Sequence, residues 1–289
     1  MLKISINNNF TKIPSDTIGI DMGHSLSKFA YLEEKDLSLS CFSTQTNIES
    51  INYFINSKKD LFNVFNFTGG KSFKLYNEYL KDFDSYLLNE FEANVKGVEF
   101  LYTMEKKRKL SRSLVVTVGT GTSIVLKNDG VQHLGGSALG GGFFMGILKA
   151  LFNFNDFDKT IELGKKGNRY NVDLKVSDIY NPEDKRVNSL FREFTAASLG
   201  KIDETFNFDT MKKEDFISSI ISLIGENIGT IATIIATKYD IAEIVFCGGF
   251  LKKNKILKQI LSLICKVNQK KAVFLKNSEY CAAIGALLL

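Results

Sequence analysis

Two histidines and four cysteines are few for a chain of 289 residues, and their positions exclude several kinds of site. His24 and His133 alone are too few for a histidine-based metal site or a catalytic triad. The cysteines lack CxxC and Cys/His spacing and lie among apolar residues, so we expect buried, reduced thiols typical of a cytoplasmic protein. They are Cys41, Cys247, Cys265 and Cys281.

Prolines and long apolar runs are also scarce. The chain has two prolines and no low-complexity stretch, so the sequence indicates no flexible linker. No run approaches the roughly 18 uninterrupted apolar residues of a membrane span. Residues 1–16 are polar and Asn-rich, unlike a signal peptide. We therefore expect a cytoplasmic protein with no membrane partner.

The composition is that of a soluble globular protein, with 44% apolar and 24% charged residues. The length suffices for two domains, each with its own core. The net charge of +5 suits phosphorylated ligands, and it equally suits a lysine-rich solvated surface. The basic run at residues 106–112 has no interleaved aromatic residues, so we expect no nucleic-acid partner.

Two short stretches share one pattern, Ile18–Lys28 (IGIDMGHSLSK) and Leu114–Ser123 (LVVTVGTGTS). Each begins with an apolar β-type run, breaks at glycines beside hydroxyl side chains, and leads to a second apolar run. Such a hairpin turn offers backbone N–H groups and hydroxyls to an oxyanion. Two of them predict a pair of loops that grip a nucleotide triphosphate from opposite sides, as in a phosphotransferase.

The first hairpin has residues with distinct expected roles. Gly23 would let the backbone approach a phosphate, and Ser25 would donate to a phosphate oxygen. Asp21 would hold Mg²⁺ through a water molecule, and Lys28 would neutralise charge on the transferred group. The alternative is a plain hairpin with an acidic residue at its turn.

The second hairpin and two further glycine-containing segments have the character of anion or nucleotide loops. Gly119, Thr120 and Gly121 would place amides and a hydroxyl around a phosphate. Gly140–Gly142 precede an apolar helix, whose free N–H groups would face a phosphate; the alternative is a flexible connection. Gly248–Gly249 follow a buried strand and would allow an adenine ring to pack flat.

Glu90 and Glu92 are candidates for a general base. Glu90 and Glu92 flank Phe91 where a helix begins, and a carboxylate at a cleft edge would accept the proton of an attacking hydroxyl. The alternative is that acidic residues simply favour a helix N-terminus. Gly70–Ser72 imitate the end of a P-loop, but the first glycine of that motif falls at Phe65, so we reject it.

Hydrophobic periodicity predicts the same order of elements twice, a β-meander followed by helix and strand. This repetition predicts a duplicated α/β fold with a cleft between an N-terminal lobe, residues 1–112, and a C-terminal lobe, residues 113–289. The principal strands are expected at 17–20, 29–33, 37–43, 61–67, 114–118, 123–127, 131–134, 244–247 and 272–275. The principal helices are expected at 47–55, 71–84, 92–105, 143–154, 215–239 and 280–289.

The order of these segments resembles the type II (eukaryotic-like) pantothenate kinases, within the sugar kinase/heat-shock chaperone/actin superfamily. The resemblance runs from about Thr17 to Leu289. Its most discriminating part is Gly167–Tyr180 (GNRYNVDLKVSDIY), which is similar to a family segment GDRxxVDLxVxDIY. Phe194–Gly200 and Ala282–Leu287 resemble further family segments.

The resemblance implies an actin-like (ribonuclease H-like) fold with ATP in the interdomain cleft. It also implies Mg²⁺- and ATP-dependent phosphorylation of pantothenate by a homodimer, with the long helices of the second half at the interface. Glu90 matches the family's catalytic glutamate, and His133 and Ser137 are expected at the acceptor. The other matching positions are Gly23, Ser25 and Lys28 in the first phosphate loop, Thr120 in the second, Gly141, Gly142 and Phe143 before the helix, and Phe157 and Gly249 at the nucleotide.

Three positions depart from the family pattern. His24 replaces a glycine of the first phosphate loop, and Asn168 replaces an aspartate. His133 stands where the family has an arginine that holds the pantothenate carboxylate, and a neutral imidazole lacks that bidentate, charged clamp. The alternatives are therefore a kinase for a pantetheine-like or other hydroxylated acceptor, and a degenerate regulator that binds nucleotide or acyl-coenzyme A.

Overall fold

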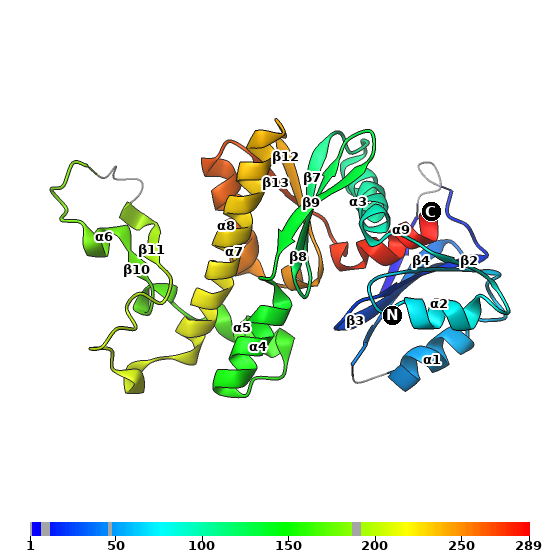
Figure 1. Ribbon diagram of the computed structural model, residues 1–289, viewed down its shortest axis with the longest axis horizontal. Coiled ribbons are helices and arrows are strands. Elements are labelled where there is room, and N and C mark those ends of the chain that lie inside the picture. Colours follow the sequence, from blue (N-terminus) through cyan, green and yellow to red (C-terminus); the bar gives the residue numbers. More distant parts are fainter. Residues whose placement is uncertain (1, 7–11, 46–47, 187–191) are drawn as a thin grey trace.

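Two β-sheets with the same strand pattern form the framework of the molecule (Figure 1). The computed structural model describes residues 2–6, 12–45, 48–186 and 192–289. The first sheet has the order β1-β4-β3-β2-β5-β6, in which β2, β3 and β4 are antiparallel and β2, β5 and β6 are parallel. Its strands are β1 (Leu2–Ser5), β2 (Thr17–Met22), β3 (Leu26–Glu33), β4 (Asp36–Ser43), β5 (Val64–Thr68) and β6 (Asp84–Leu87).

The second sheet repeats this arrangement in the order β13-β12-β7-β8-β9. Strands β7, β8 and β9 form an antiparallel meander, and β7, β12 and β13 are parallel. The strands are β7 (Ser113–Val118), β8 (Thr122–Lys127), β9 (Val131–Ser137), β12 (Glu243–Cys247) and β13 (Lys271–Phe274). The duplication expected from the repeated pattern is therefore confirmed.

Helices cover both faces of each sheet. On the outer face of the first sheet, α1 (Ile48–Asn56) and α2 (Phe73–Tyr79) bury the apolar side chains of β2, β3 and β5. On the outer face of the second sheet, α4 (Gly141–Phe152), α7 (Lys213–Lys238) and α8 (Lys255–Val267) pack on alternate residues of β7 and β8. Asn47, the expected first residue of the α1 segment, lies outside the described residues.

Two helices, α3 (Glu90–Lys106) and α9 (Cys281–Leu288), lie between the sheets (Figure 1). They share one apolar core with residues of both sheets. Their close packing depends on small residues, since a Cβ at Gly97 would lie 1.9 Å from the Cys281 carbonyl oxygen. Helix α9 thus completes the first lobe although it comes late in the chain, and the expected boundary near residue 112 stays a prediction.

Helix α7 is long and apolar enough to span a membrane by length and composition alone, with 56% of its most apolar window buried within the protein. Its buried side chains belong to the outer core of the second lobe, where they pack with α8 and with α5 (Phe157–Gly164). Serine, glycine and threonine interrupt its apolar residues. The helix packs as the core helix of a globular lobe.

An arm of short elements projects beyond α7 (Figure 1). Its elements are η1 (Arg169–Asn171), β10 (Leu174–Lys175), α6 (Val176–Ile179), β11 (Thr195–Ala197) and η3 (Phe208–Thr210).

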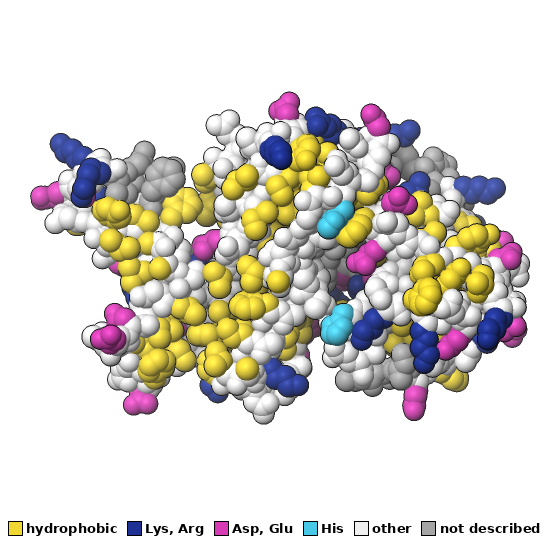
Figure 2. Space-filling view, in the orientation of Figure 1, with side chains coloured by type: hydrophobic (Ala, Val, Ile, Leu, Met, Phe, Trp, Pro, Cys, Tyr) yellow, Lys and Arg dark blue, Asp and Glu magenta, His cyan; other side chains and the backbone are white. Residues whose placement is uncertain are grey.

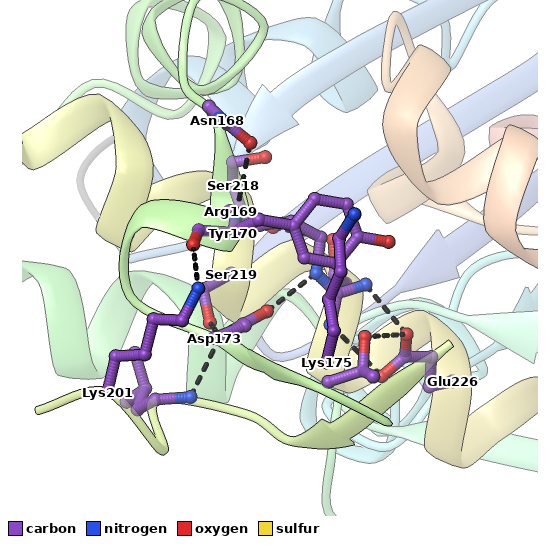
Figure 3. Close-up of polar contacts among 12 residues, drawn as sticks. Asn168, Arg169, Tyr170, Asp173, Lys175, Lys201, Ser218, Ser219 and Glu226 are labelled. Carbon is purple, nitrogen blue, oxygen red and sulfur yellow. Dashed lines mark hydrogen bonds and ion pairs between the residues drawn. The ribbon is translucent and has the colours of Figure 1, made fainter. Parts of the chain in front are cut away.

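A partly buried ion pair and a buried hydrogen bond hold the base of this arm to α7 (Figure 3). Arg169 donates to Asp173 at 2.6 Å and bidentately to Glu226 of α7 at 2.6 and 3.2 Å. Asp173 is fully buried and also accepts from the Leu199 amide and from Ser219 of α7. The Gly167–Tyr180 segment that carries the family resemblance therefore anchors the arm.

Candidate active site

The two predicted loops face one another across the lobes. In the β2–β3 turn the Gly23 amide donates to the Leu26 carbonyl at 3.1 Å, and in the β7–β8 turn the Gly119 amide donates to the Gly121 carbonyl at 2.8 Å. Between the turns, the Ser25 Oγ and Thr120 Oγ1 atoms lie 3.0 Å apart and remain exposed. The β2–β3 and β7–β8 hairpins therefore face one another, each with a hydroxyl side chain at its turn.

The start of α4 differs in one respect from the sequence-based expectation. The helix starts at Gly141, two residues earlier than expected, and the amides of Gly141 and Gly142 donate at 2.8 Å to the carbonyls of Gly119 and Thr120. That further amides of this helix start face a phosphate stays a prediction. The helix begins directly against the loop, whose carbonyls satisfy the amides that a helix N-terminus leaves unpaired. A Cβ at Gly140 would lie 2.7 Å from the Thr120 carbonyl oxygen, so the close approach needs glycine.

Asp21 and Lys28 form an ion pair beside the first turn. They are register partners on β2 and β3, and Lys28 Nζ lies 3.0 Å from Asp21 Oδ2 with both side chains largely buried. Burial opposes the charged form of Lys28, but the Asp21 carboxylate outweighs it and raises the pKa of Lys28 above its ordinary value. Lys28 therefore compensates Asp21, and a direct role on the transferred group stays a prediction.

Glu90 is the first residue of α3, at the carboxyl-terminal edge of the first sheet. The Asn89 side chain caps the helix by accepting from the amides of Phe91 at 2.8 Å and Glu92 at 3.3 Å. The Glu90 side chain is accessible to solvent. Partial burial, with the nearby charge of Asp21, raises the pKa of Glu90 above its ordinary value, as suits a general base.

Strand β9 of the second lobe brings both expected acceptor residues towards this region. The His133 imidazole stacks on the Phe91 ring, with centroids 4.1 Å apart and planes at 12°. His133 thereby lies over the residue that follows Glu90, across the lobe boundary. Ser137 accepts from the Leu139 amide at 3.1 Å and pairs with Thr122 just beyond the second loop.

The His24 side chain is exposed at the edge of the first loop. Its Nε2 atom lies 3.0 Å from Gln45 Nε2. Because Ser25 and Thr120 are in direct contact, the His24 side chain does not fill the space between them. Figure 2 shows the histidine side chains on one face of the molecule, beside the boundary between the lobes.

Gly248 and Gly249, the glycines expected to border the nucleotide, follow the end of β12; we call them the nucleotide edge. Gly248 has a φ of +106° and its Cβ would lie 2.5 Å from the Val118 carbonyl oxygen, whereas a Cβ at Gly249 would meet nothing within 4 Å. Beside them, the rings of Phe144, Phe157 and Phe250 have centroids 5.2–6.2 Å apart. Phe157 thus lies near Gly249 through Phe250. Phe143 is half-buried and packs on the second-lobe core.

Sequence reasoning missed Asn89 as a cap, Phe91 as the partner of His133, and Asn94 as a buried polar residue of α3. The cap could have been found, since Asn before a first turn that contains two acidic residues is a helix-start signal. The Phe91 stack and the Asn94 contacts join residues more than 20 positions apart, and no local pattern marks them.

Comparison with known proteins finds related sequences over most of the chain. The Fumble family model matches residues 35–289. A type II pantothenate kinase of Bacillus cereus (strain AH820) is 34% identical over 277 residues, with 94% of this chain and 96% of that protein covered. One from Oceanobacillus iheyensis is 32% identical over 271 residues, with 94% and 98% covered.

Solved structures extend the likeness at the level of the fold. A ROK family glucokinase from Streptomyces griseus, solved with glucose and AMPPNP, has a TM-score of 0.55 at 12% identity, covering 94% of this chain and 97% of that one. The actin-like α/β fold is thereby confirmed. With the sequence relatives above, this chain belongs to the Fumble family of type II pantothenate kinases.

Proposed function

We propose that the protein is an ATP-dependent kinase that phosphorylates the terminal hydroxyl of pantothenate, giving 4'-phosphopantothenate in the first step of coenzyme A biosynthesis. One observation carries the chemistry: the Ser25 and Thr120 hydroxyls lie 3.0 Å apart across the lobes. Glu90 lies at the same edge, within electrostatic reach of Asp21. Family membership supports pantothenate as the acceptor.

In this mechanism the Glu90 carboxylate accepts the proton of the acceptor hydroxyl. The acceptor oxygen then forms a bond to the γ-phosphorus of ATP as the bond to the bridging oxygen breaks, and ADP leaves. Ser25, Thr120 and the loop amides would hold the phosphates. Mg²⁺, when bound with the nucleotide, neutralises phosphate charge, and Asp21 would hold it through water, as befits an ion that takes few carboxylates.

The nucleotide would extend from these hydroxyls towards Gly249 and Phe157. The open space at Gly249 supports this placement, because a flat base needs close approach to backbone. The Gly141 and Gly142 amides shape the loop around Thr120, and Phe143 would border the nucleotide. These residues would therefore act on ATP largely by holding the second loop in place.

A second candidate is a kinase whose acceptor lacks a carboxylate, such as pantetheine. The stack of His133 on Phe91 favours it, because this side chain brings no permanent charge to the acceptor side. Initial rates with pantothenate and pantetheine at saturating Mg-ATP, with products identified by mass spectrometry, separate the two. Phosphopantothenate as the preferred product supports the first proposal, and a preference for pantetheine supports the second.

Replacing His133 by arginine is expected to raise kcat/KM for pantothenate relative to pantetheine by about tenfold, since a charged hydrogen bond contributes about 1.5–3 kcal/mol. Arginine can keep the stack on Phe91 while it pairs with a carboxylate. Gln132→Arg is the matched control, because adjacent strand residues point to opposite faces. An unchanged ratio for His133→Arg would remove His133 from the acceptor site.

ATP binding in calorimetry without turnover on either acceptor would indicate a degenerate regulator instead.

We also propose a cytoplasmic homodimer formed through the long helices of the second lobe. Ile234 of α7 and Leu263 of α8 support this surface, since both are large apolar side chains at least half exposed. Light scattering should give about twice the protomer mass of 32.4 kDa, and a monomer at micromolar concentration would contradict the proposal.

A further inference from the structure

A polar cluster of two buried residues and one partly buried residue joins the two lobes behind the candidate site. Asn94 of α3, 6% exposed, directs its Nδ2 atom to Thr117 Oγ1 of β7 in a close hydrogen bond, and to Cys247 Sγ of β12 at 3.8 Å. Thr117 Oγ1 and Cys247 Sγ lie 3.3 Å apart and are register partners in the parallel β7–β12 pair. We call Asn94, Thr117 and Cys247 the interlobe node.

Each member of the interlobe node lies within four residues, along the chain, of a residue of the candidate site. Asn94 follows Glu90 by four residues on the same face of α3. Thr117 precedes Gly119 by two residues, and Cys247 directly precedes Gly248. The base, the second phosphate loop and the nucleotide edge therefore extend from three elements that meet at one point.

The first lobe is tied to the same point by α9. Hydrogen bonding with the Cys281 thiol, at the start of α9, lowers the pKa of Cys247. Helix α9 in turn packs on β2, where a Cβ at Gly19 would lie 2.1 Å from the Ala283 carbonyl oxygen. Strand β2 leads into the first phosphate loop, so both loops and the base share this anchor.

The surroundings make these hydrogen bonds specific. The node lies within the core that α3 and α9 share with both sheets, where most contacts are apolar and non-directional. A buried amide that loses its partner costs about 1–3 kcal/mol. The hydrogen bonds of Asn94 therefore favour one register of α3 against β7 and β12, whereas apolar contacts alone would tolerate a shift.

We infer that Asn94 is a positioning residue that sets the placement of Glu90 relative to the second phosphate loop by holding α3 to Thr117 and Cys247. The inference rests on the proposed kinase function. Asn94 touches no reacting atom in this scheme, and its effect passes through the helix to Glu90. A loss of register should thus slow the chemical step while nucleotide binding persists.

Four variants test the inference in the full-length protein. Asn94→Leu and Thr117→Val remove the polar contacts at similar volume, Thr117→Ser keeps the hydroxyl, and Ser222→Ala removes a buried hydroxyl that bonds within α7. Asn94→Leu and Thr117→Val should lower kcat by about 10–100-fold, as small misplacements of reacting groups do. KM for ATP should change by less than about threefold, since the loops themselves remain.

Thr117→Ser should keep most of the kcat that Thr117→Val loses. Ser222→Ala should leave kcat unchanged even if it lowers the melting temperature. The double variant Asn94→Leu/Thr117→Val should be no slower than the worse single variant, because both remove one interaction. A purely structural role predicts instead lower melting temperatures with kcat unchanged per folded molecule. That result, or failure of Thr117→Ser to restore activity, would overturn the inference.

Hydrogen exchange separates this inference from the proposed function. In Asn94→Leu, amides at residues 90–94 and 117–121 should exchange faster than in the unchanged protein, while α7 keeps its protection. If the protein without substitutions shows no kinase activity, that result counts against the proposed function and not against the contacts of Asn94. Unchanged protection in the variant would overturn the positioning role whatever the activity.

Discussion

Replacing Glu90 by glutamine is expected to lower kcat for phosphorylation by about 10²–10⁴-fold, the range for loss of a general base. Glutamine keeps the size and hydrogen-bonding capacity of the side chain but cannot accept a proton at neutral pH. Calorimetry with a non-hydrolysable ATP analogue should show nearly unchanged affinity, because Glu90 would contact the acceptor and not the nucleotide. Steady-state rates and calorimetry together therefore isolate the chemical step.

The pH dependence follows from the raised pKa of Glu90. Partial burial and, secondarily, the charge of Asp21 favour its protonated form, so activity should begin to fall at a pH above the ordinary carboxyl value of 4.5 as the pH is lowered. Because the folded state disfavours the charged form of Glu90, this residue lowers the stability of the folded state at neutral pH. Glu90→Gln should therefore raise the melting temperature at pH 7, and this gain should vanish below the ordinary pKa.

Glu92→Gln is the matched control for this experiment. Glu92 lies two residues further along the same helix and its side chain is exposed. Its replacement should leave kcat and the acid limb of the pH profile unchanged. Retained turnover in Glu90→Gln, or an equal loss in Glu92→Gln, would remove Glu90 from the role of base.

Replacing Gly97 by alanine is expected to reduce the free energy of unfolding by at least about 3 kcal/mol, the upper range for overpacking a rigid core. The new methyl group would lie 1.9 Å from the Cys281 carbonyl oxygen and 2.6 Å from its carbonyl carbon. These are backbone atoms of α9, so no side-chain rotation can relieve the clash. Denaturation in urea, with the midpoint and slope both measured, checks the prediction.

Gly146→Ala is the matched control, since it makes the same change in another helix. A Cβ at Gly146 in α4 would meet nothing within 4 Å. Alanine should therefore stabilise the protein by about 0.5–1 kcal/mol through its higher helix propensity. A mild effect at Gly97, comparable with that at Gly146, would contradict the close packing of α3 against α9.

Local patterning predicted much of the framework. The alternation of apolar residues placed the principal strands within a few residues, and the glycine-hydroxyl turns identified both loops. Boundaries were less accurate: the helix expected at 71–84 is α2, Phe73–Tyr79, since the chain turns at Leu80 towards β6. The buried elements were predictable because their periodicity reflects burial itself.

Non-local contacts account for what the sequence did not reveal. The amides of Gly141 and Gly142 bond to the carbonyls of Gly119 and Thr120, which lie about 20 residues earlier and which no local pattern marks as acceptors. The polar residues of the arm likewise found partners on α7, as Arg169 did with Glu226. A single sequence indicates which groups need a hydrogen-bond partner, but three-dimensional packing decides which group satisfies each need.

The position of α9 between the sheets has a consequence for biosynthesis. During translation, β2 and α3 leave the ribosome long before residues 281–288, and until then the inner surface of the N-terminal sheet lacks its cover. A fragment holding residues 1–112 should for the same reason expose that apolar surface and aggregate. Maturation of the N-terminal half would therefore wait for synthesis of the C-terminal half, and the two would be completed together.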